Sequence, residues 1–189
     1  MMAQLRQKLL FAKTFFKHPI MLGSAIPSSR YLTENLLNRV DWQRARVIVE
    51  YGPGVGTLTW PMLERMRSDA RLIAIEANQD FARYLDSANR DPRLQVVHGS
   101  AENVRQALLE RGLHCADYIV SGIPFSTLPP EVRRHILRES CDSLCPGGTF
   151  LVYQFSGAVL PHLRKVFAGV EQDFELRNIL PARIFHCVR

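Results

Sequence analysis

The hydrophobic positions of this chain fall into short runs that are separated by longer, half-polar segments. The runs are rich in branched and aromatic residues and end at turn residues, so each predicts a buried strand. The predicted strands are Val47–Glu50, Leu72–Ile75, Leu94–Val97, Tyr118–Val120 and Phe150–Phe155. The segments between them predict helices over about Leu58–Arg67, Gln79–Asn89, Ala101–Glu110 and Pro130–Ser140. Strands that alternate with helices predict an α/β fold with a parallel sheet covered on both faces.

The two ends of the chain continue this pattern in different ways. Towards the C-terminus we predict a helix at about Val159–Phe167 and strands at Phe174–Ile179 and Ile184–Val188. These two strands are too close together for a helical crossover, which predicts an antiparallel ending. Before the first strand, Ser28 or Ser29 can cap a helix whose apolar side carries Leu32, Leu36 and Leu37. A chain of 189 residues predicts one domain over 1–189, with a helical extension over about residues 1–40.

The first residues form an amphipathic pattern of their own. At about 100° per residue, a helix over Ala3–His18 has a basic stripe and a broad apolar face. The stripe holds Arg6, Lys13 and Lys17, and the apolar face holds Leu5, Leu9, Phe11, Phe15 and Phe16, with Lys8 near its edge. Aromatic side chains opposite basic ones are typical of a helix in the interface of an anionic membrane. We therefore expect residues 3–18 to bind such a surface; the alternative is a helix packed on the sheet.

Composition and charge restrict the expected location of the protein and the kinds of partner it can bind. No apolar run reaches the roughly 18 residues of a membrane span, and lysines interrupt the N-terminal apolar residues, unlike a cleavable signal. A cytoplasmic protein is therefore expected. The net charge of +6 favours an anionic partner, either nucleic acid or a membrane surface. The four cysteines, which include Cys141 and Cys145 on one predicted helix face, predict reduced, semi-buried thiols and no metal site.

The stretch VIVEYGPGVGTLT, residues 47–59, carries the first candidate chemistry. A strand, a glycine-rich turn and a helix form a corner where a ligand can approach the backbone. The strand ends at Glu50, and Gly52, Gly54, Gly56 and Thr57 follow. This spacing departs from the dinucleotide pattern G-x-G-x-x-G, which argues against a pyrophosphate ligand. The carboxyl group that ends the strand can accept from the amino group of a bound amino-acid moiety or from loop amides.

An acid also ends the second predicted strand. Glu76 lies about 20 residues beyond the glycines, where a carboxylate can accept both ribose hydroxyl protons. The alternative is a cap for the helix that begins near Gln79, a role that Asn78 could also fill. A ligand that contains ribose is therefore indicated.

Several of these stretches resemble one family, the Rossmann-like, seven-stranded methyltransferases that use S-adenosylmethionine. Residues 47–59 resemble their first motif, and Glu76 followed by Ala77 matches their ribose-binding acid. VVHGSAEN, residues 96–103, resembles the adenine-binding turn and assigns Ser100 and Ala101 to it, although many members have Asp where this chain has Ser100. LCPGGTFLVYQF, residues 144–155, resembles the entry to their fifth strand. The resemblance implies their sheet and their cofactor, with the glycines making room for its methionine part.

The segment after the fourth strand lines the acceptor pocket in that family. Adenine-N6 methyltransferases carry Asn or Asp, then x, Pro and an aromatic residue. This chain keeps Pro124 and Phe125 but has Ser121 in front, which would hold an adenine amine less well. The run Ser-Gly-Ile-Pro, with residues 15–37 and 178–189, resembles instead the bacterial phospholipid N-methyltransferases. The related rRNA adenine dimethylases usually carry an extra C-terminal helical domain, for which this chain leaves no room.

This second resemblance implies N-methylation of phosphatidylethanolamine and its mono- and dimethyl forms towards phosphatidylcholine, at the inner face of the membrane. Only a neutral amine can attack, so positioning and proton loss are the tasks of the site. We expect Tyr31 to orient the amine, in preference to His18 and His135, and Ser121 to contact both cofactor and acceptor. Phe125 either faces the developing ammonium by cation–π attraction or packs in the core.

Two other functions compete with this one. A nucleic-acid base methyltransferase is favoured by the net charge and by the Pro-Phe pair, but opposed by Ser121. A non-catalytic protein that binds cofactor or lipid would need a damaged glycine loop or ribose acid, and neither is seen. We therefore predict a peripheral-membrane, monomeric methyltransferase with a lipid substrate and no nucleic-acid partner.

Overall fold

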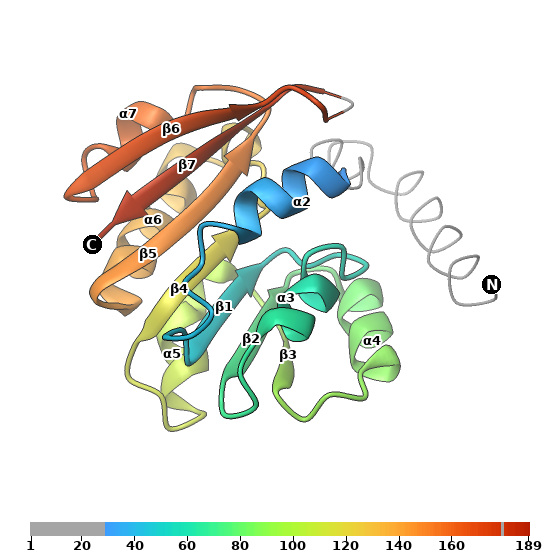
Figure 1. Cartoon of the computed structure of the whole chain (residues 1–189). Coiled ribbons are helices and arrows are strands. Elements are labelled where there is room, and N and C mark those ends of the chain that lie inside the picture. Colours follow the sequence, from blue (N-terminus) through green and yellow to red (C-terminus); the bar gives the residue numbers. More distant parts are fainter. Residues whose placement is uncertain (1–28, 179) are drawn as a thin grey trace.

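A mixed seven-stranded sheet is the centre of the computed structural model, which describes residues 29–178 and 180–189 (Figure 1). The strands are β1 (Val47–Tyr51), β2 (Arg71–Glu76), β3 (Leu94–His98), β4 (Ala116–Ser121), β5 (Leu144–Gln154), β6 (Gly169–Glu175) and β7 (Ala182–Val188). Their order is β3-β2-β1-β4-β5-β7-β6, and β7 runs antiparallel to both of its neighbours. The predicted seven-stranded sheet with an antiparallel last strand is confirmed.

Helices cover both faces of this sheet, as the alternating pattern predicts. They are α2 (Arg30–Leu37), α3 (Thr59–Arg65), α4 (Gln79–Ala88), α5 (Val104–Leu109), α6 (Pro130–Ser143) and α7 (Leu160–Leu163). In Figure 1, α2, α3 and α4 lie on one side of the sheet, and α5, α6 and α7 lie on the other. The buried residues accordingly form two clusters, one on each face. The parallel strands β1, β2 and β4 are therefore buried on both sides, which explains their continuous apolar runs.

Helix α2 is fixed at its start by a side-chain cap and by a contact to the far end of the chain. The hydroxyl of Ser29 accepts from the amide of Leu32 at 3.2 Å, so Ser29 is the N-cap. The amide of Ser29 donates to Oδ1 of Asn178 at 2.9 Å. The buried side chains Leu32, Leu36 and Leu37 then hold the helix on the sheet. The first turn of α2 is thereby fixed beside the turn that joins β6 to β7.

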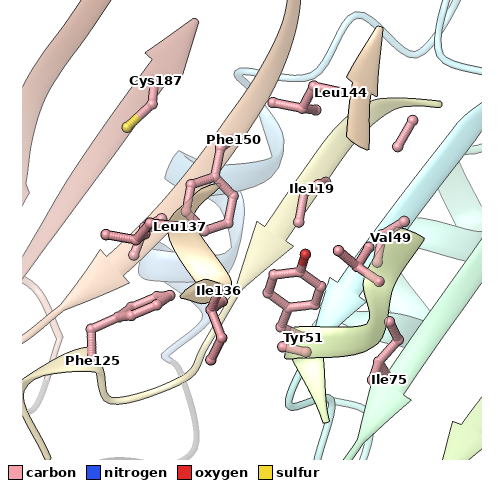
Figure 2. Packing of buried hydrophobic residues seen from close by; sticks show 14 of the residues in the cluster. Val49, Tyr51, Ile75, Ile119, Phe125, Ile136, Leu137, Leu144, Phe150 and Cys187 are labelled. Carbon is pink, nitrogen blue, oxygen red and sulfur yellow. The ribbon is translucent and has the colours of Figure 1, made fainter. Parts of the chain in front are cut away.

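Aromatic rings fill the opposite face of the sheet (Figure 2). Phe150 is fully buried and makes edge contacts with Tyr51 and with Phe125, and it stacks on Phe167. The hydroxyl of Tyr51 is paired with that of Ser140 at 3.1 Å, so the buried phenol keeps a polar partner. Because Phe125 belongs to the segment after β4, its contact with Phe150 anchors that segment to the core.

The last third of the chain differs most from the sequence prediction. The sixth strand is Gly169–Glu175, whereas the prediction was Phe174–Ile179. It lies at the edge of the sheet and pairs with β7 alone, so polar side chains are tolerated there and no apolar run marks it. Helix α7 is also shorter than predicted. Strand β5 begins earlier, at Leu144, because Leu144 pairs with Ala116 of β4 before a register shift, and the Pro-Gly-Gly segment lies within that shift.

The cysteines were also predicted wrongly in part. Cys115 and Cys145 form a disulfide, with 5.0 Å between their Cα atoms, while Cys141 and Cys187 are free thiols. The pair is 30 residues apart in sequence, but the pairing of β4 with β5 brings the starts of the two strands together. Helix α6 ends at Ser143, so Cys141 and Cys145 do not share a helix face.

The predicted membrane-binding helix over residues 3–18 lies outside the described residues. Among the residues that are described, no helix has both the length and the hydropathy needed to cross a bilayer.

Candidate active site

The carboxyl ends of three neighbouring strands bring the predicted site residues to one edge of the sheet. In the strand register, Tyr51 at the end of β1 is opposite Ile75 in β2 and Ser121 in β4. The amide of Gly52 continues the β1–β2 pairing by donating to the Ile75 carbonyl at 2.9 Å. The glycine loop, Glu76 and Ser121 therefore meet at the edge where open α/β sheets bind ligands.

The three glycines of the loop all have positive φ, but they serve different purposes. A Cβ on Gly56 would lie 2.3 Å from Nε1 of Trp60, so Gly56 is needed for packing inside the loop. Gly54, at φ +57°, has no heavy atom within 4 Å of such a Cβ. Its backbone borders open space, as the approach of a ligand requires. Thr57, next to this loop, is only half buried.

Glu76 is held by the backbone on both sides of it. One carboxylate oxygen accepts from the amide of Gly54 at 2.9 Å, and the other accepts from the amide of Asn78 at 2.8 Å. Asn78 itself caps α4, so Glu76 is not needed as the cap. A carboxylate has about four acceptor positions, and two remain for hydroxyl groups of a ligand. Burial raises the pKa of Glu76, while the bonds from Asn78 and Gly54 oppose the increase.

Glu50 is the second acid of the site and is more deeply enclosed. Its carboxyl group accepts from the hydroxyl of Thr59 at 2.7 Å, and only 2% of the residue is exposed. Burial raises the pKa of Glu50 to about 8, the bond from Thr59 works against this, and the charge of Glu76 adds to the increase. Glu50 is therefore protonated at neutral pH in this structure. A cationic ligand group would favour its ionised form.

The turn after β3 borders the same edge. The amide of Gly99 donates to the Glu76 carbonyl at 2.9 Å, which ties this turn to the end of β2. Ser100 uses its hydroxyl locally, since Oγ accepts from the amide of Glu102 at 3.2 Å and is paired with its carboxylate at 3.1 Å. Ala101 is buried beside it, and Ala77 is exposed after β2. The residues predicted for adenine binding thus line one edge, with the serine hydroxyl engaged in its own turn.

The predicted acceptor segment leaves the end of β4 and turns immediately. Ser121 is fully buried, and its hydroxyl accepts from the amide of Ile123 at 3.4 Å. Pro124 is half buried, whereas Phe125 is fully buried and lies edge-on against Phe150. Figure 2 shows the Phe125 ring directed into the core, which matches the packing alternative. Pro124 is therefore the member of the Pro-Phe pair that stays partly exposed.

Two residues of β5 support this segment and were not singled out from the sequence. Gln154 is buried; its amide oxygen accepts from the amide of Phe125 at 3.1 Å, and its nitrogen donates to the Ile123 carbonyl at 2.7 Å. A Cβ on Gly122 would come within 2.7 Å of the Tyr153 hydroxyl, so a larger residue there would displace the Tyr153 ring. The available signal was an amide side chain at the end of an otherwise apolar strand, since a buried amide needs partners.

Tyr31 lies on the first turn of α2, which is a separate element from the glycine loop and from the segment after β4. Half of the residue is exposed, and the guanidinium of Arg177 lies 4.5 Å from the centre of its ring. The two residues border a hollow of about 390 Å³ whose other lining residues are Glu34, Asn35, Asn38 and Arg39. His135 is exposed on α6, on the other face of the sheet, and His18 lies outside the described residues. The part of Tyr31 in orienting an amine stays a prediction.

Comparisons with known proteins agree with this arrangement. Residues 16–108 match the family model described as ribosomal RNA adenine dimethylase. The ornithine lipid N-methyltransferase of Singulisphaera acidiphila is 36% identical over 181 residues, which cover 94% of this chain and 94% of that one.

Solved structures share the fold at low sequence identity. The precorrin-6y C5,15-methyltransferase of Geobacter metallireducens GS-15 has a TM-score of 0.68 at 13% identity, over 85% of this chain and 90% of that one. The structure of PigF with SAH has a TM-score of 0.63 at 16% identity, over 85% of this chain and 55% of that one. The chain therefore belongs to the class I S-adenosylmethionine-dependent methyltransferases, in the family of that ornithine lipid N-methyltransferase and related to the rRNA adenine dimethylases.

Proposed function

We propose that this methyltransferase acts on the head-group amine of a membrane lipid. Phosphatidylethanolamine and its mono- and dimethyl forms are the head groups that the acceptor motif favours, with phosphatidylcholine as the end product. Ornithine lipid is the second candidate, because a relative that matches almost the whole chain carries that substrate in its name. The observation that carries the proposal is this near-complete match, which includes the acceptor segment.

RNA is the less favoured acceptor for two reasons. The match to the rRNA adenine dimethylase model ends at residue 108, before the acceptor segment begins. The segment itself begins with Ser121 instead of an amide or carboxylate, and its hydroxyl faces the amide of Ile123. A poorly nucleophilic base amine needs a good hydrogen-bond acceptor as it attacks. The part of this chain that matches the rRNA adenine dimethylases, residues 16–108, is thus the part that holds the glycine loop and Glu76.

The cofactor supplies an electrophilic methyl group on a sulfonium, together with an amino-acid part and a ribose. Glu76 would accept from the ribose hydroxyls with the acceptor positions that Gly54 and Asn78 leave free. Glu50 would become ionised against the ammonium of the amino-acid part, since a nearby cation lowers the pKa of a carboxyl group. The two buried acids therefore suit a ligand with positive charge, and the open space over Gly54 admits it.

The chain's own task at the acceptor is to hold a neutral amine in line with the methyl group. Ser121 is fully buried, and an amine that is buried beside it would favour its neutral form over its ammonium. With the cofactor bound, the amine lone pair would take the methyl group from the sulfonium, which would leave as the neutral thioether S-adenosylhomocysteine. A primary or secondary amine would then release one proton to water. The carbonyl of Ile123 already accepts from Gln154, but a carbonyl oxygen has a second acceptor position, which would be open to a remaining N–H group. Orientation of this kind supplies much of the rate when the methyl donor is already activated.

Methyl transfer from labelled S-adenosylmethionine tests the proposal directly. The protein is incubated with vesicles that contain phosphatidylethanolamine, with vesicles that contain ornithine lipid, and with ribosomal RNA. We expect label in a lipid fraction and none in RNA, and the labelled lipid identifies the head group. Label in RNA alone would make the chain a base methyltransferase. No label in any fraction, with S-adenosylmethionine bound, would indicate a binding protein.

A further inference from the structure

The large exposed hydrophobic side chains of the described residues are concentrated in one place. They are Tyr31 (50% exposed), Leu109 (53%), Phe174 (47%), Leu176 (73%) and Leu180 (46%). All except Leu109 lie in or beside the turn between β6 and β7, because Arg177 of that turn lies over the ring of Tyr31. We call Tyr31, Phe174, Leu176 and Leu180 the hairpin surface.

The hairpin surface lies at the edge of the sheet that carries the acceptor segment. Strand β7 begins where β5 ends, and Arg183 in β7 is paired with Gln154 in β5. The Gln154 side chain binds the backbone of Ile123 and Phe125 directly. In Figure 1 the turn between β6 and β7 accordingly lies near the start of α2, beyond the tip of β5. The Gln154 side chain thus lies between Arg183, near the start of β7, and the acceptor segment.

The charged groups around the hairpin surface suit a lipid interface. The guanidinium of Arg183 lies 4.8 Å from the centre of the Phe174 ring. The guanidinium of Arg177 lies 4.5 Å from the centre of the Tyr31 ring. An arginine on an aromatic ring can keep its charge at the level of lipid phosphates while the ring enters the interface. The acid between them, Glu175, is only 3% exposed and is paired with Arg177.

From this arrangement we infer that the hairpin surface is a membrane-contact site that sets the acceptor segment against the head groups of a bilayer. The inference rests on the proposed function, since a lipid amine must reach the acceptor segment while its acyl chains stay in the bilayer. Apolar side chains with a rim of arginine are the chemistry that such an interface takes. Glu175 pairs with Arg177, and Asp173 pairs with Arg39 just after α2, so these two acids offset part of the nearby arginine charge. We therefore expect this contact to depend mainly on apolar burial and little on salt.

A paired substitution tests the site, with a matched control in the same chain. The variant is Leu176→Asp with Leu180→Asp, and the control is Leu109→Asp, which changes a leucine elsewhere whose exposure lies between those of the pair. Leu109 ends α5 near Arg111, whose carbonyl binds the side chain of Arg71 at the start of β2, so it belongs to the opposite edge of the sheet.

Flotation with vesicles of phosphatidylethanolamine and phosphatidylglycerol measures the binding. Each leucine that enters the interface contributes enough for roughly a ten-fold change in partitioning. We therefore expect binding of the paired variant, and methyl transfer to vesicle lipid, to fall at least roughly ten-fold, while the control matches the wild type. Both variants should retain the wild-type melting temperature and affinity for S-adenosylmethionine. Equal flotation of the paired variant and the wild type would overturn the inference.

A soluble substrate separates this inference from the proposed function. A short-chain phosphatidylethanolamine, used below its critical micelle concentration, needs no membrane contact, so the paired variant should methylate it at the wild-type rate. A wild type that methylates no lipid would contradict the proposed function, and flotation would still decide the contact site. Unchanged flotation together with a dimer that only the paired variant loses would assign the surface to self-association.

A tryptophan reporter covers the case in which the paired variant does not fold. Leu176→Trp should lose fluorescence on vesicles that carry brominated acyl chains, because bromine quenches an indole at short range. Leu109→Trp should show no loss beyond that of the wild type, which contains Trp42 and Trp60. Equal quenching of the two variants would contradict the membrane contact.

Discussion

The carboxylate of Glu76 holds the glycine loop in place as well as being the candidate ribose ligand. Its oxygens accept from Gly54 and Asn78, so its removal leaves two backbone donors without a partner and takes away two free acceptor positions. Glu76→Ala should weaken S-adenosylmethionine binding by about 1.5–3 kcal/mol, the scale of a hydrogen bond to a charged group. Isothermal titration calorimetry measures this, with Asp80→Ala, an exposed acid in the same helix–strand unit, as control. Equal affinity in the two variants would remove Glu76 from the site.

Glu50 should make the stability of the folded chain depend on pH. Its pKa of about 8 lies above the ordinary value of 4.5, so the folded chain keeps a proton that the unfolded chain releases. The stability that this proton provides is complete below about pH 4.5 and is lost as the pH rises through 8. Glu50→Gln should therefore lessen the fall in unfolding free energy over this range, by at most about 1.4 kcal/mol per pH unit. Urea unfolding at several pH values measures the slopes, and parallel slopes for wild type and variant would contradict the assignment.

At this scale the sequence predicts residue types well and contacts less well. The two acids and the glycine loop could be found because strand ends and turn glycines follow from local pattern. The different tasks of Gly54 and Gly56 depend on Trp60, and the cap of α4 by Asn78 depends on backbone direction, which the pattern leaves open. The burial of Phe125 depends on Phe150, a residue from a different strand.

The element that most directly supports the acceptor segment is the end of β5. Gln154 bonds to Phe125 and Ile123, and Gln154→Met would leave that amide and that carbonyl without the partner. We expect the segment to shift, so that kcat for lipid methylation falls by roughly 10²-fold, as a displacement of about 1 Å can cause. Steady-state kinetics should show this loss while the affinity for S-adenosylmethionine stays at the wild-type value. Gln172→Met, in the edge strand β6, is the control.

A parallel loss of kcat and of cofactor affinity in Gln154→Met would indicate general unfolding instead of a positioning role. The cost to stability is expected to be about 1–3 kcal/mol, the penalty for unpaired buried polar groups. Thermal melting of both variants therefore accompanies the kinetics.

The pairing of β4 with β5 also explains the disulfide that the sequence did not predict. Cysteine spacing gives no sign of a contact that depends on the strand register, and the same holds for the edge strand β6, whose polar residues carry no strand pattern. By loop closure over 30 residues, the Cys115–Cys145 bond should add about 3–4 kcal/mol to the unfolding free energy. Denaturant unfolding with and without reductant measures this. Alkylation in denaturant without reductant should label two thiols, Cys141 and Cys187, because Cys187 is buried in the folded chain; four labelled thiols would contradict the bond.

At the scale of the whole molecule, the fold follows from the alternation of strands and helices, but the direction in which the enzyme faces its substrate does not. The antiparallel ending brings the β6–β7 turn to the carboxyl edge, beside the start of α2, and Ser29 is joined to Asn178 there. Segments that are far apart in the sequence thus border one acceptor edge.

The overall charge predicts a second, salt-dependent contribution to membrane binding. Three of the four lysines are Lys8, Lys13 and Lys17, in the segment over residues 3–18 for which an amphipathic helix is predicted. Each basic residue near an anionic surface contributes about 1 kcal/mol, and salt screens this attraction. Replacing Lys13 and Lys17 by Gln should therefore weaken flotation with anionic vesicles at low salt and reduce its salt dependence. The matched control is Lys165→Gln, which removes the remaining lysine, exposed near α7.

The two membrane contributions should separate in the same assay. The paired Asp variant of the hairpin surface is expected to lower binding at every salt concentration, because apolar burial is not screened, whereas the Gln variant should lower it only where salt is low. A Gln variant with the salt dependence of the wild type would show that the N-terminal lysines do not face the bilayer. The basic residues that remain, mainly arginines of the folded domain, would then have to carry the attraction.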